Sequence, residues 1–241
     1  PVFTATAILM GASVLLMVLF VKENKWAEEM RKEAYELGIE TEHDEDHEKI
    51  RMPKAVRRSM LFLLFSIAFW FMGYNAVISA FSRYATIELD FTTANASLVL
   101  LIANGAAIVS FIPIGKLSNR WGRKKTILRG VVLLAVAFGT AFSYQSYSPW
   151  MILNFVLAGM AWAAINVNSL PMVLEMASEA EIGEYTGLYY TFSMAAQIIT
   201  PILSGVLFDL FSYRILFPYA VFFILCAFLT MRQVEHGDSL L

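Results

Sequence analysis

Six long stretches of this chain contain no charged residue, and they determine its predicted architecture. The charge-free stretches cover residues 1–21, 61–82, 91–115, 131–174, 185–208 and 215–231. A helix that crosses a bilayer needs roughly 20 mostly apolar residues. Five stretches fit one helix each, and 131–174 fits two helices separated by the polar segment Tyr144–Pro149. The pattern therefore predicts an all-α, multi-pass membrane protein with seven transmembrane helices.

The composition agrees with a membrane protein and excludes several other classes. Hydrophobic residues make up 58% of the chain and charged residues only 16%, whereas soluble domains contain roughly 45–50% apolar residues. One cysteine, Cys226, cannot form a disulfide framework. His43 and His47 lie four positions apart among carboxylates and could hold a metal, but a solvated linker is the favoured interpretation. We expect no enzyme activity, cofactor, metal or nucleic-acid partner.

The basic residues predict the orientation of the chain in the membrane. Of the 18 Lys and Arg residues, all but Arg83 and Arg214 lie in residues 22–59, in residues 115–130 or after residue 231. The positive-inside rule places such segments in the cytoplasm. We therefore expect a transmembrane helix over 1–21, a cytoplasmic central loop over 22–59, a six-helix transmembrane domain over 60–231 and a cytoplasmic tail over 232–241.

The segment Gly115–Ile127, with the sequence GKLSNRWGRKKTI, carries a recognisable motif. We expect Gly115 and Gly122 to bracket a turn that presents Arg120, Arg123 and Lys124. The pattern resembles the loop that the major facilitator superfamily of secondary transporters places between paired helices. In that family the loop forms charge contacts that latch one conformation, and Asn119 occupies the position where the family usually has an acidic residue.

The resemblance implies a domain organisation and a fold. Residues 1–21 look like the sixth helix of a twelve-helix transporter, followed by its central loop and its C-terminal half of six helices. On this interpretation the N-terminal half of the transporter is missing from the chain. The first helix then enters the membrane from the outside without needing an exported N-terminus.

The segment Gly115–Ile127, which we call the basic hairpin, has acidic residues available to pair with it, and these predict a gate on the cytoplasmic side. Glu175 ends one apolar stretch, and Glu184 precedes the next. We expect this acidic segment to pair with the hairpin and close the inner gate in the outward-facing state. The alternative is that the hairpin only sets the topology. The predicted gating residues are Gly115, Asn119, Arg120, Gly122, Arg123, Lys124, Glu175 and Glu184.

Uncharged polar residues inside the apolar stretches form the predicted substrate site. Burying an amide without a partner is costly, so these groups must face each other, water or a ligand. Amides and aromatic faces together suit a neutral polyhydroxylated ligand, and we expect a solvent-filled cavity between the second, fifth and sixth spans. Hydrogen bonding between helices is the alternative. The candidates are Tyr74, Asn75, Asn104, Trp162, Asn166, Asn168, Tyr190 and Gln197.

Two further stretches narrow the resemblance to one branch of the superfamily. Trp162–Glu175 (WAAINVNSLPMVLE) and Glu184–Gln197 (EYTGLYYTFSMAAQ) resemble bacterial sugar carriers related to the glycoside–pentoside–hexuronide:cation symporters and the sucrose symporters. This resemblance implies sugar uptake across the bacterial cytoplasmic (inner) membrane, coupled to H⁺ or Na⁺. No carboxylate lies deep in any predicted span, so the coupling cation is expected mainly in the missing half. The alternatives are a drug or metabolite exporter of the same superfamily and a non-transporting membrane protein.

Overall fold

A computed structural model of the protein describes residues 9–13, 15–16, 52–178 and 181–238. Residues 1–51 and 52–241 form two separate units, and the second contains the helical bundle. The predicted first span therefore lies largely outside the described residues, although residues 9–13 and 15–16 are helical. The predicted central loop is described only from Met52 onward, and Lys54 already begins the first helix of the bundle.

The bundle contains six long helices and one short 3-10 helix, and no strand occurs among the described residues. Five of these segments, α3, α4, α6, α7 and α8 extended by η2, are long and apolar enough to cross a membrane. The remaining helix, α5, has 19 residues and carries Arg123, Lys124, Lys125 and Arg129 in its first two turns. The predicted all-α, multi-pass fold is confirmed. The helices are α3 (Lys54–Glu88), α4 (Thr93–Trp121), α5 (Arg123–Ala141), α6 (Pro149–Leu174), α7 (Ile182–Leu210), η2 (Tyr213–Ile215) and α8 (Leu216–Arg232).

Local sequence explains where several helices begin and end. The Thr92 side chain accepts a hydrogen bond from the Asn95 backbone N–H at 3.2 Å and caps α4. Proline occupies the first position of α6, where its missing N–H costs nothing. The expected turn between Gly115 and Gly122 is wrong, because α4 continues through Gly115 as far as Trp121. Gly122 alone reverses the chain, with φ +87°, a value that favours glycine.

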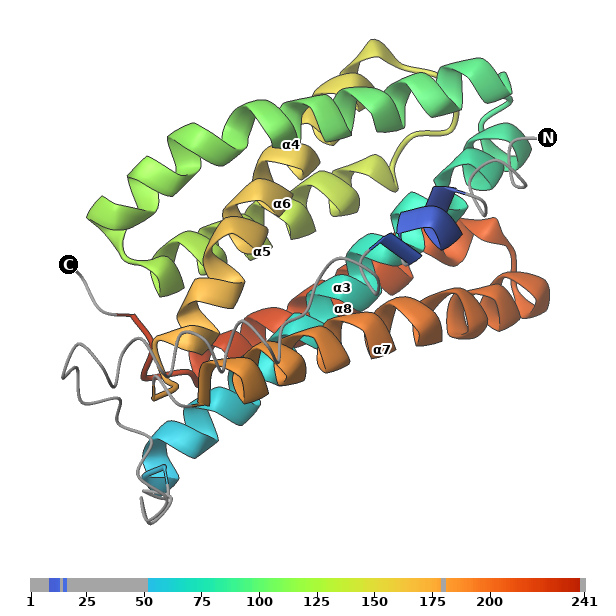
Figure 1. The fold of residues 1–241 in the computed structure, drawn as a ribbon. Helices are drawn as coiled ribbons and strands as arrows, with labels where there is room; N and C mark the ends of the chain where they lie inside the picture. The colour runs from blue at the N-terminus through green and yellow to red at the C-terminus, as the bar shows by residue number, and fades with distance from the viewer. Residues whose placement is uncertain (1–8, 14, 17–51, 179–180, 239–241) are drawn as a thin grey trace, which may run out of the picture. The chain divides into compact units, whose positions relative to one another are not determined.

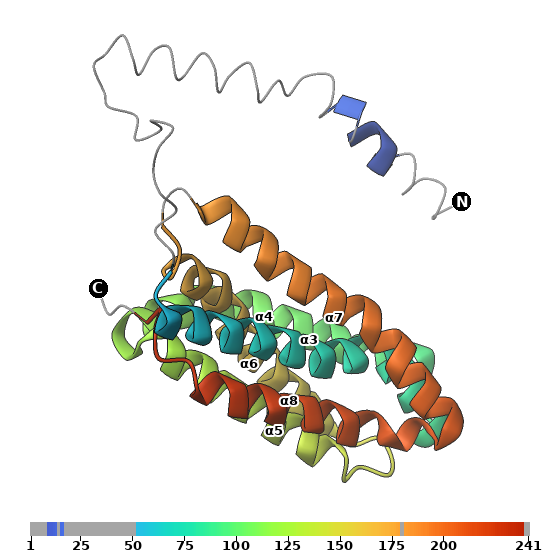
Figure 2. The ribbon, with the colours of Figure 1, turned by 90° about the horizontal axis from the view of Figure 1, so that it is seen from below.

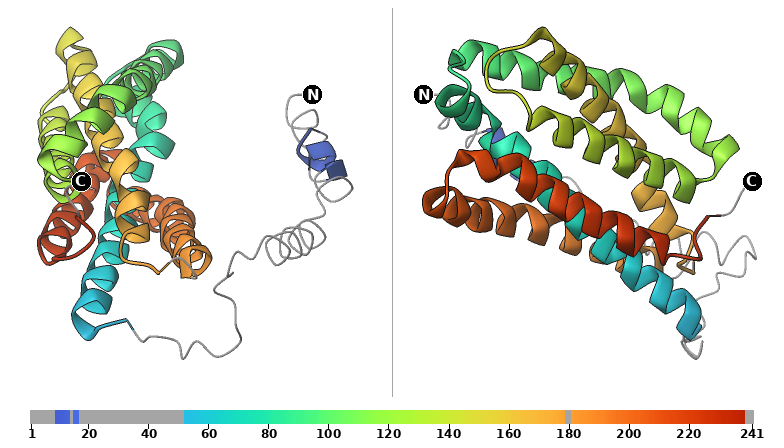
Figure 3. Two further views of the ribbon diagram at one scale, coloured as in Figure 1. Left: turned by 60° about the vertical axis from the view of Figure 1, so that its left-hand side comes forward. Right: turned by 180° about the vertical axis from the view of Figure 1, so that it is seen from behind.

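The helices pack as two groups of three, and each group combines helices from the first half and the second half of the bundle sequence (Figures 1 and 2). Helix α6 packs against α4 and α5, while α3 packs against α7 and α8. Helix α5 also contacts α8 and so joins the two groups, as the rear view in Figure 3 allows the reader to follow. The first helix of each sequential triplet, α3–α5 or α6–α8, therefore packs against the second and third helices of the other triplet. This exchange is the arrangement expected of a three-helix repeat, because each triplet makes equivalent contacts with the other.

Burial differs strongly among the helices. In the most apolar window of α3, 56% of the residues are buried, compared with 22% in α4 and 28% in α7. Helices α4 and α7 occupy equivalent places in the two triplets, so the two least buried helices correspond to each other. Each presents a long apolar face to its surroundings, which includes Ile108, Val109 and Ile112 on α4 and Ile198 and Ile202 on α7.

Glycines set the closest approaches between helices of the bundle. A Cβ atom added at Gly159 would collide with the Ala103 carbonyl oxygen, so α6 lies directly against the backbone of α4 at this position. A Cβ at Gly130 of α5 would lie 2.9 Å from the Ala161 carbonyl oxygen of α6. Small residues are the usual means of bringing membrane helices together.

We predict that Gly159→Val destabilises the bundle, because the new side chain forces α4 away from α6. Overpacking typically costs about 1–3 kcal/mol. Gly139→Val is the matched control, since Gly139 is also helical but has no atom within 4 Å of an added Cβ. Thermal unfolding of the purified full-length protein should give a lower Tm for the first variant only. An equal fall in both variants would contradict the packing described here.

Candidate substrate site and gate

An aromatic cluster lies where α3 meets α6. The rings of Tyr74 and Trp162 stack in parallel, with centroids 3.7 Å apart and an interplanar angle of 2°. Phe71 packs edge-on against Trp162 at 5.1 Å. Tyr74 is only 7% exposed. The two rings pack directly against each other between α3 and α6, two of the three helices among which the sequence predicted a solvent-filled cavity, because stacked aromatic surfaces stabilise each other.

Polar groups continue along α6 from this cluster. Asn166 lies one turn beyond Trp162 and is half-buried. Ser169, almost one turn further, shares a hydrogen bond of 3.1 Å with the Tyr189 hydroxyl and so links α6 to α7. Neither Ser169 nor Tyr189 was among the predicted site residues. The spacing of Ser169 from Trp162 and Asn166 could have identified it, whereas Tyr189 differs from its neighbour Tyr190 only in its burial.

Two of the predicted substrate residues bind the backbone of their own helices. The Asn75 amide donates to the Phe71 carbonyl at 2.8 Å, and the Asn168 amide donates to the Ala164 carbonyl at the same distance. Asn168 is only 1% exposed and lies inside the bundle. These bonds satisfy the amide donors within one helix, so they match neither the predicted substrate contacts nor the alternative of hydrogen bonds between helices.

The remaining predicted substrate residues lie on the exposed sides of α4 and α7. The Asn104 amide donates to the Leu100 carbonyl at 2.9 Å, and the Gln197 amide donates to the Ser193 carbonyl at 3.3 Å. Tyr190 is 45% exposed and packs edge-on against Tyr189. Of the predicted substrate residues, Asn166 thus lies one helical turn from Trp162 on α6, whereas Asn104, Tyr190 and Gln197 lie on exposed sides of α4 and α7.

Several helix ends meet at one end of the bundle, which we call the basic end. It contains the α4–α5 turn at Gly122, the end of α6 at Glu175 and the end of α8 at Arg232. The Arg123 guanidinium forms an ion pair with the Glu175 carboxylate, and the side chains are 23% and 21% exposed. This pair is partly shielded from water, so it interacts more strongly than a fully solvated surface pair.

The other predicted gating residues contribute unequally to the basic end. The Lys124 ammonium donates to the Arg232 carbonyl at 3.2 Å and so contacts the end of α8. Gly115 lies within α4, where an added Cβ would approach Val167 of α6 to 3.9 Å. Three residues are exposed and form no side-chain hydrogen bond or ion pair within the described ranges: Asn119, Arg120 and Glu184.

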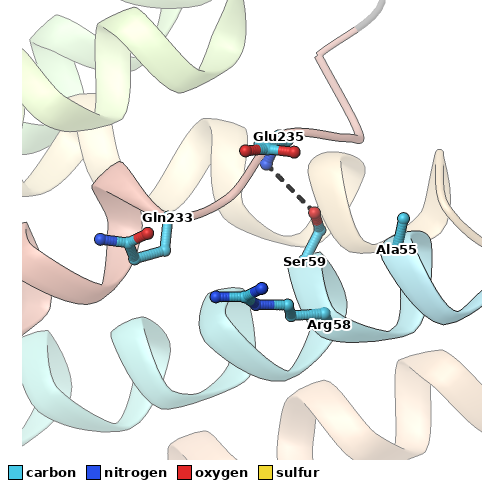
Figure 4. A pocket seen from close by; sticks show the side chains of 5 residues that line it. All are labelled: Ala55, Arg58, Ser59, Gln233 and Glu235. Carbon is cyan, nitrogen blue, oxygen red and sulfur yellow. Dashed lines mark hydrogen bonds between the residues drawn. The ribbon is translucent and has the colours of Figure 1, made fainter.

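The basic end also contains residues that the sequence did not single out. Asp238 accepts a hydrogen bond from the Arg123 backbone N–H at 2.5 Å. No local pattern could have identified this contact, because 115 positions separate the two residues. A small pocket of about 150 Å³ lies nearby, lined by Ala55, Arg58, Ser59, Gln233 and Glu235 (Figure 4). Its lining comes from the start of α3 and from the segment that follows α8.

We predict that the Arg123–Glu175 pair is energetically coupled. Arg123→Gln and Glu175→Gln should each lower the free energy of unfolding of the full-length protein. With a loss of about 1 kcal/mol in each single variant, the double variant should be no less stable than the worse single variant, which corresponds to a coupling of about 1 kcal/mol. Glu184→Gln is the charge-matched control, since Glu184 is exposed and pairs with no described residue. Additive effects in denaturant-induced unfolding would show that the pair contributes nothing.

Comparison with known proteins supports the resemblance noted in the sequence. The chain is 25% identical over 204 residues to the uncharacterized MFS-type transporter MJ1317 of Methanocaldococcus jannaschii, a match that covers 83% of this chain and 48% of the relative. It is 25% identical over 156 residues to a Na(+), Li(+), K(+)/H(+) antiporter of Planococcus maritimus, covering 62% of this chain and 36% of the relative. A third relative, the chloramphenicol resistance protein CraA of Acinetobacter baumannii, is 25% identical over 162 residues, covering 66% of this chain and 38% of the relative.

A solved structure has the same fold. The human organic anion transporter MFSD10 matches with a TM-score of 0.61 and 13% sequence identity, over 78% of this chain and 49% of that chain. This chain spans about half the length, or less, of each of these proteins. The family model of the Major Facilitator Superfamily matches residues 61–239. The chain therefore belongs to the Major Facilitator Superfamily, whose members are membrane transporters.

Proposed function

We propose that this chain is the C-terminal part of a secondary transporter that moves a small neutral molecule by alternating access. The observation that supports this proposal is the stacked pair of Tyr74 and Trp162 where α3 meets α6, with Asn166 one turn beyond Trp162 on α6. We call these three residues the cluster. These are the first helices of the two triplets, so the cluster lies where the repeats meet. Transporters of this type bind their substrates at the interface between repeats.

The chemistry of the cluster favours an uncharged substrate with polar groups. It combines flat aromatic surfaces with an amide and contains no ionised side chain. Aromatic surfaces pack against the apolar faces of sugar rings, and an amide can both donate to and accept from hydroxyl groups. We therefore propose cation-coupled symport of a sugar or glycoside. The coupling cation, H⁺ or Na⁺, would bind mainly in a part of the transporter outside this chain, because no carboxylate lies deep in any of the predicted spans.

Export of a drug-like molecule is the second candidate. The rings of Phe71, Tyr74 and Trp162 would offer a largely apolar surface if the stack opened. One of the relatives is named a chloramphenicol resistance protein. Both candidates use the same residues and differ in the direction of transport and in the polarity of the ligand.

The basic end supports a proposal for orientation and gating. Sixteen of the 18 Lys and Arg residues of the chain lie in segments that the positive-inside rule assigns to the cytoplasm. We propose that the basic end faces the cytoplasm of a bacterial cell and that the Arg123–Glu175 pair holds the inner gate closed in the outward-facing state. Opening this gate would then require separating two partly shielded charges.

The test is transport by the full-length protein in proteoliposomes. Under an imposed H⁺ or Na⁺ gradient, we expect accumulation of a radiolabelled disaccharide or glycoside, and Trp162→Ala and Asn166→Ala should each reduce the initial rate at least tenfold. Trp150→Ala and Asn95→Ala are the matched controls, because both residues are exposed near helix starts and should leave the rate unchanged.

The outcomes separate the two candidates. Movement of chloramphenicol against its gradient, without sugar accumulation, would support export in place of sugar symport. Unchanged transport in both cluster variants would remove the cluster from the substrate site. Failure to move any tested neutral compound under either ion gradient would overturn the proposed function.

A further inference from the structure

The segment that follows α8 folds back across the basic end and is fixed to α3. The Glu235 backbone N–H donates to the Ser59 hydroxyl at 3.1 Å, and the His236 ring nitrogen Nδ1 lies 2.9 Å from the same hydroxyl oxygen. Figure 4 shows the first of these bonds beside the small pocket. Val234 is completely buried. We call residues 233–238 the tail segment.

The tail segment then passes close to the end of α6. Gly237 adopts φ +83°, and an added Cβ there would lie 2.6 Å from the Met172 carbonyl oxygen. Only glycine combines this backbone conformation with such a close approach to another backbone. The tail segment is therefore shaped to cross α6 and to deliver Asp238 to the α4–α5 turn.

Asp238 performs the role of a helix cap at the start of α5. The N-cap residue of α5 is Gly122, which has no side chain to accept a hydrogen bond from the first turn. The Asp238 carboxylate takes this role by accepting from the Arg123 backbone N–H at 2.5 Å. A carboxylate is favoured at a helix N-terminus, because the first N–H groups lack partners within the helix and carry partial positive charge.

The same contact bears on the ion pair of the gate. Arg123 is held at two points, through its backbone by Asp238 and through its guanidinium by Glu175. The basic hairpin itself contains no acidic residue, and Asn119 is exposed. A Cβ added at Gly122 would lie 2.9 Å from the Asp238 carboxylate, so the turn and the tail segment fit each other closely.

We propose that Asp238 is a positioning residue for the gate. By capping α5 it holds Arg123 where the guanidinium reaches Glu175, which makes the tail segment part of the closed basic end. The consequence of this capping for gating rests on the proposed transport function.

The first test is hydrogen exchange of the full-length protein in lipid nanodiscs. Loss of a helix cap typically changes local stability by a factor of about five, so Asp238→Ala should speed amide exchange in residues 123–126 by about that factor. Asp238→Asn keeps an acceptor oxygen and should have a smaller effect. Glu235→Ala is the matched control, since its contact with Ser59 uses only the backbone. Unchanged exchange in Asp238→Ala, or an equal rise in the control, would overturn the proposal.

The second test separates positioning from simple capping. The double-variant cycle of Arg123→Gln and Glu175→Gln is repeated in the Asp238→Ala and Asp238→Asn backgrounds. We expect the approximately fivefold coupling of the pair to fall to about onefold in the Ala background and to be partly kept in the Asn background. Full coupling in both backgrounds would show that Asp238 caps α5 without positioning Arg123. Neither test needs a substrate, so either can fail independently of the transport assay.

Discussion

A hydrocarbon environment supplies no hydrogen bonds to a protein backbone, and this constraint underlies the rest of the structure. Each segment that crosses the bilayer must satisfy its N–H and C=O groups internally, which favours helices. Charged side chains are then confined to the helix ends. Among the described residues, ion pairs that join distant parts of the chain accordingly lie at the two ends of the bundle, Arg123 with Glu175 at one end and Glu88 with Arg214 at the other.

Between these ends, the packing depends on small residues and aromatic rings. Gly130 and Gly159 allow α5 and α4 to approach α6 at backbone distance, and the ring stack of Tyr74 and Trp162 joins α3 to α6. The exchange of partners between the two triplets follows from this packing. It leaves α4 and α7 as the least buried helices. The polar residues on their exposed sides, Asn104 and Gln197, are therefore available to whatever covers these faces in the membrane.

The basic end illustrates how one residue can connect several elements. Arg123 immediately follows the turn at Gly122, where its backbone is bound by the tail segment and its side chain by the end of α6. Lys124 adds a contact to the last carbonyl of α8. A structural change at the basic end of α5, α6 or α8 would therefore alter the contacts of the other two helices. The proposed opening of the gate requires such coupling.

The sequence alone was enough to predict an all-α, multi-pass fold and the distribution of charge, because the length and polarity of each stretch decide locally whether it can cross a bilayer. It also predicted that Glu175 lies near the basic hairpin. Three features became visible only in the folded chain: Tyr74 and Trp162 stack together, Asn168 binds its own helix, and α4 continues past Gly115. The contact of Asp238 with Arg123 could likewise not be predicted from the sequence, since it depends on how six helices pack and on two glycines with positive φ. The spacing of residues along one helix does not indicate which residues of another helix will pack against them.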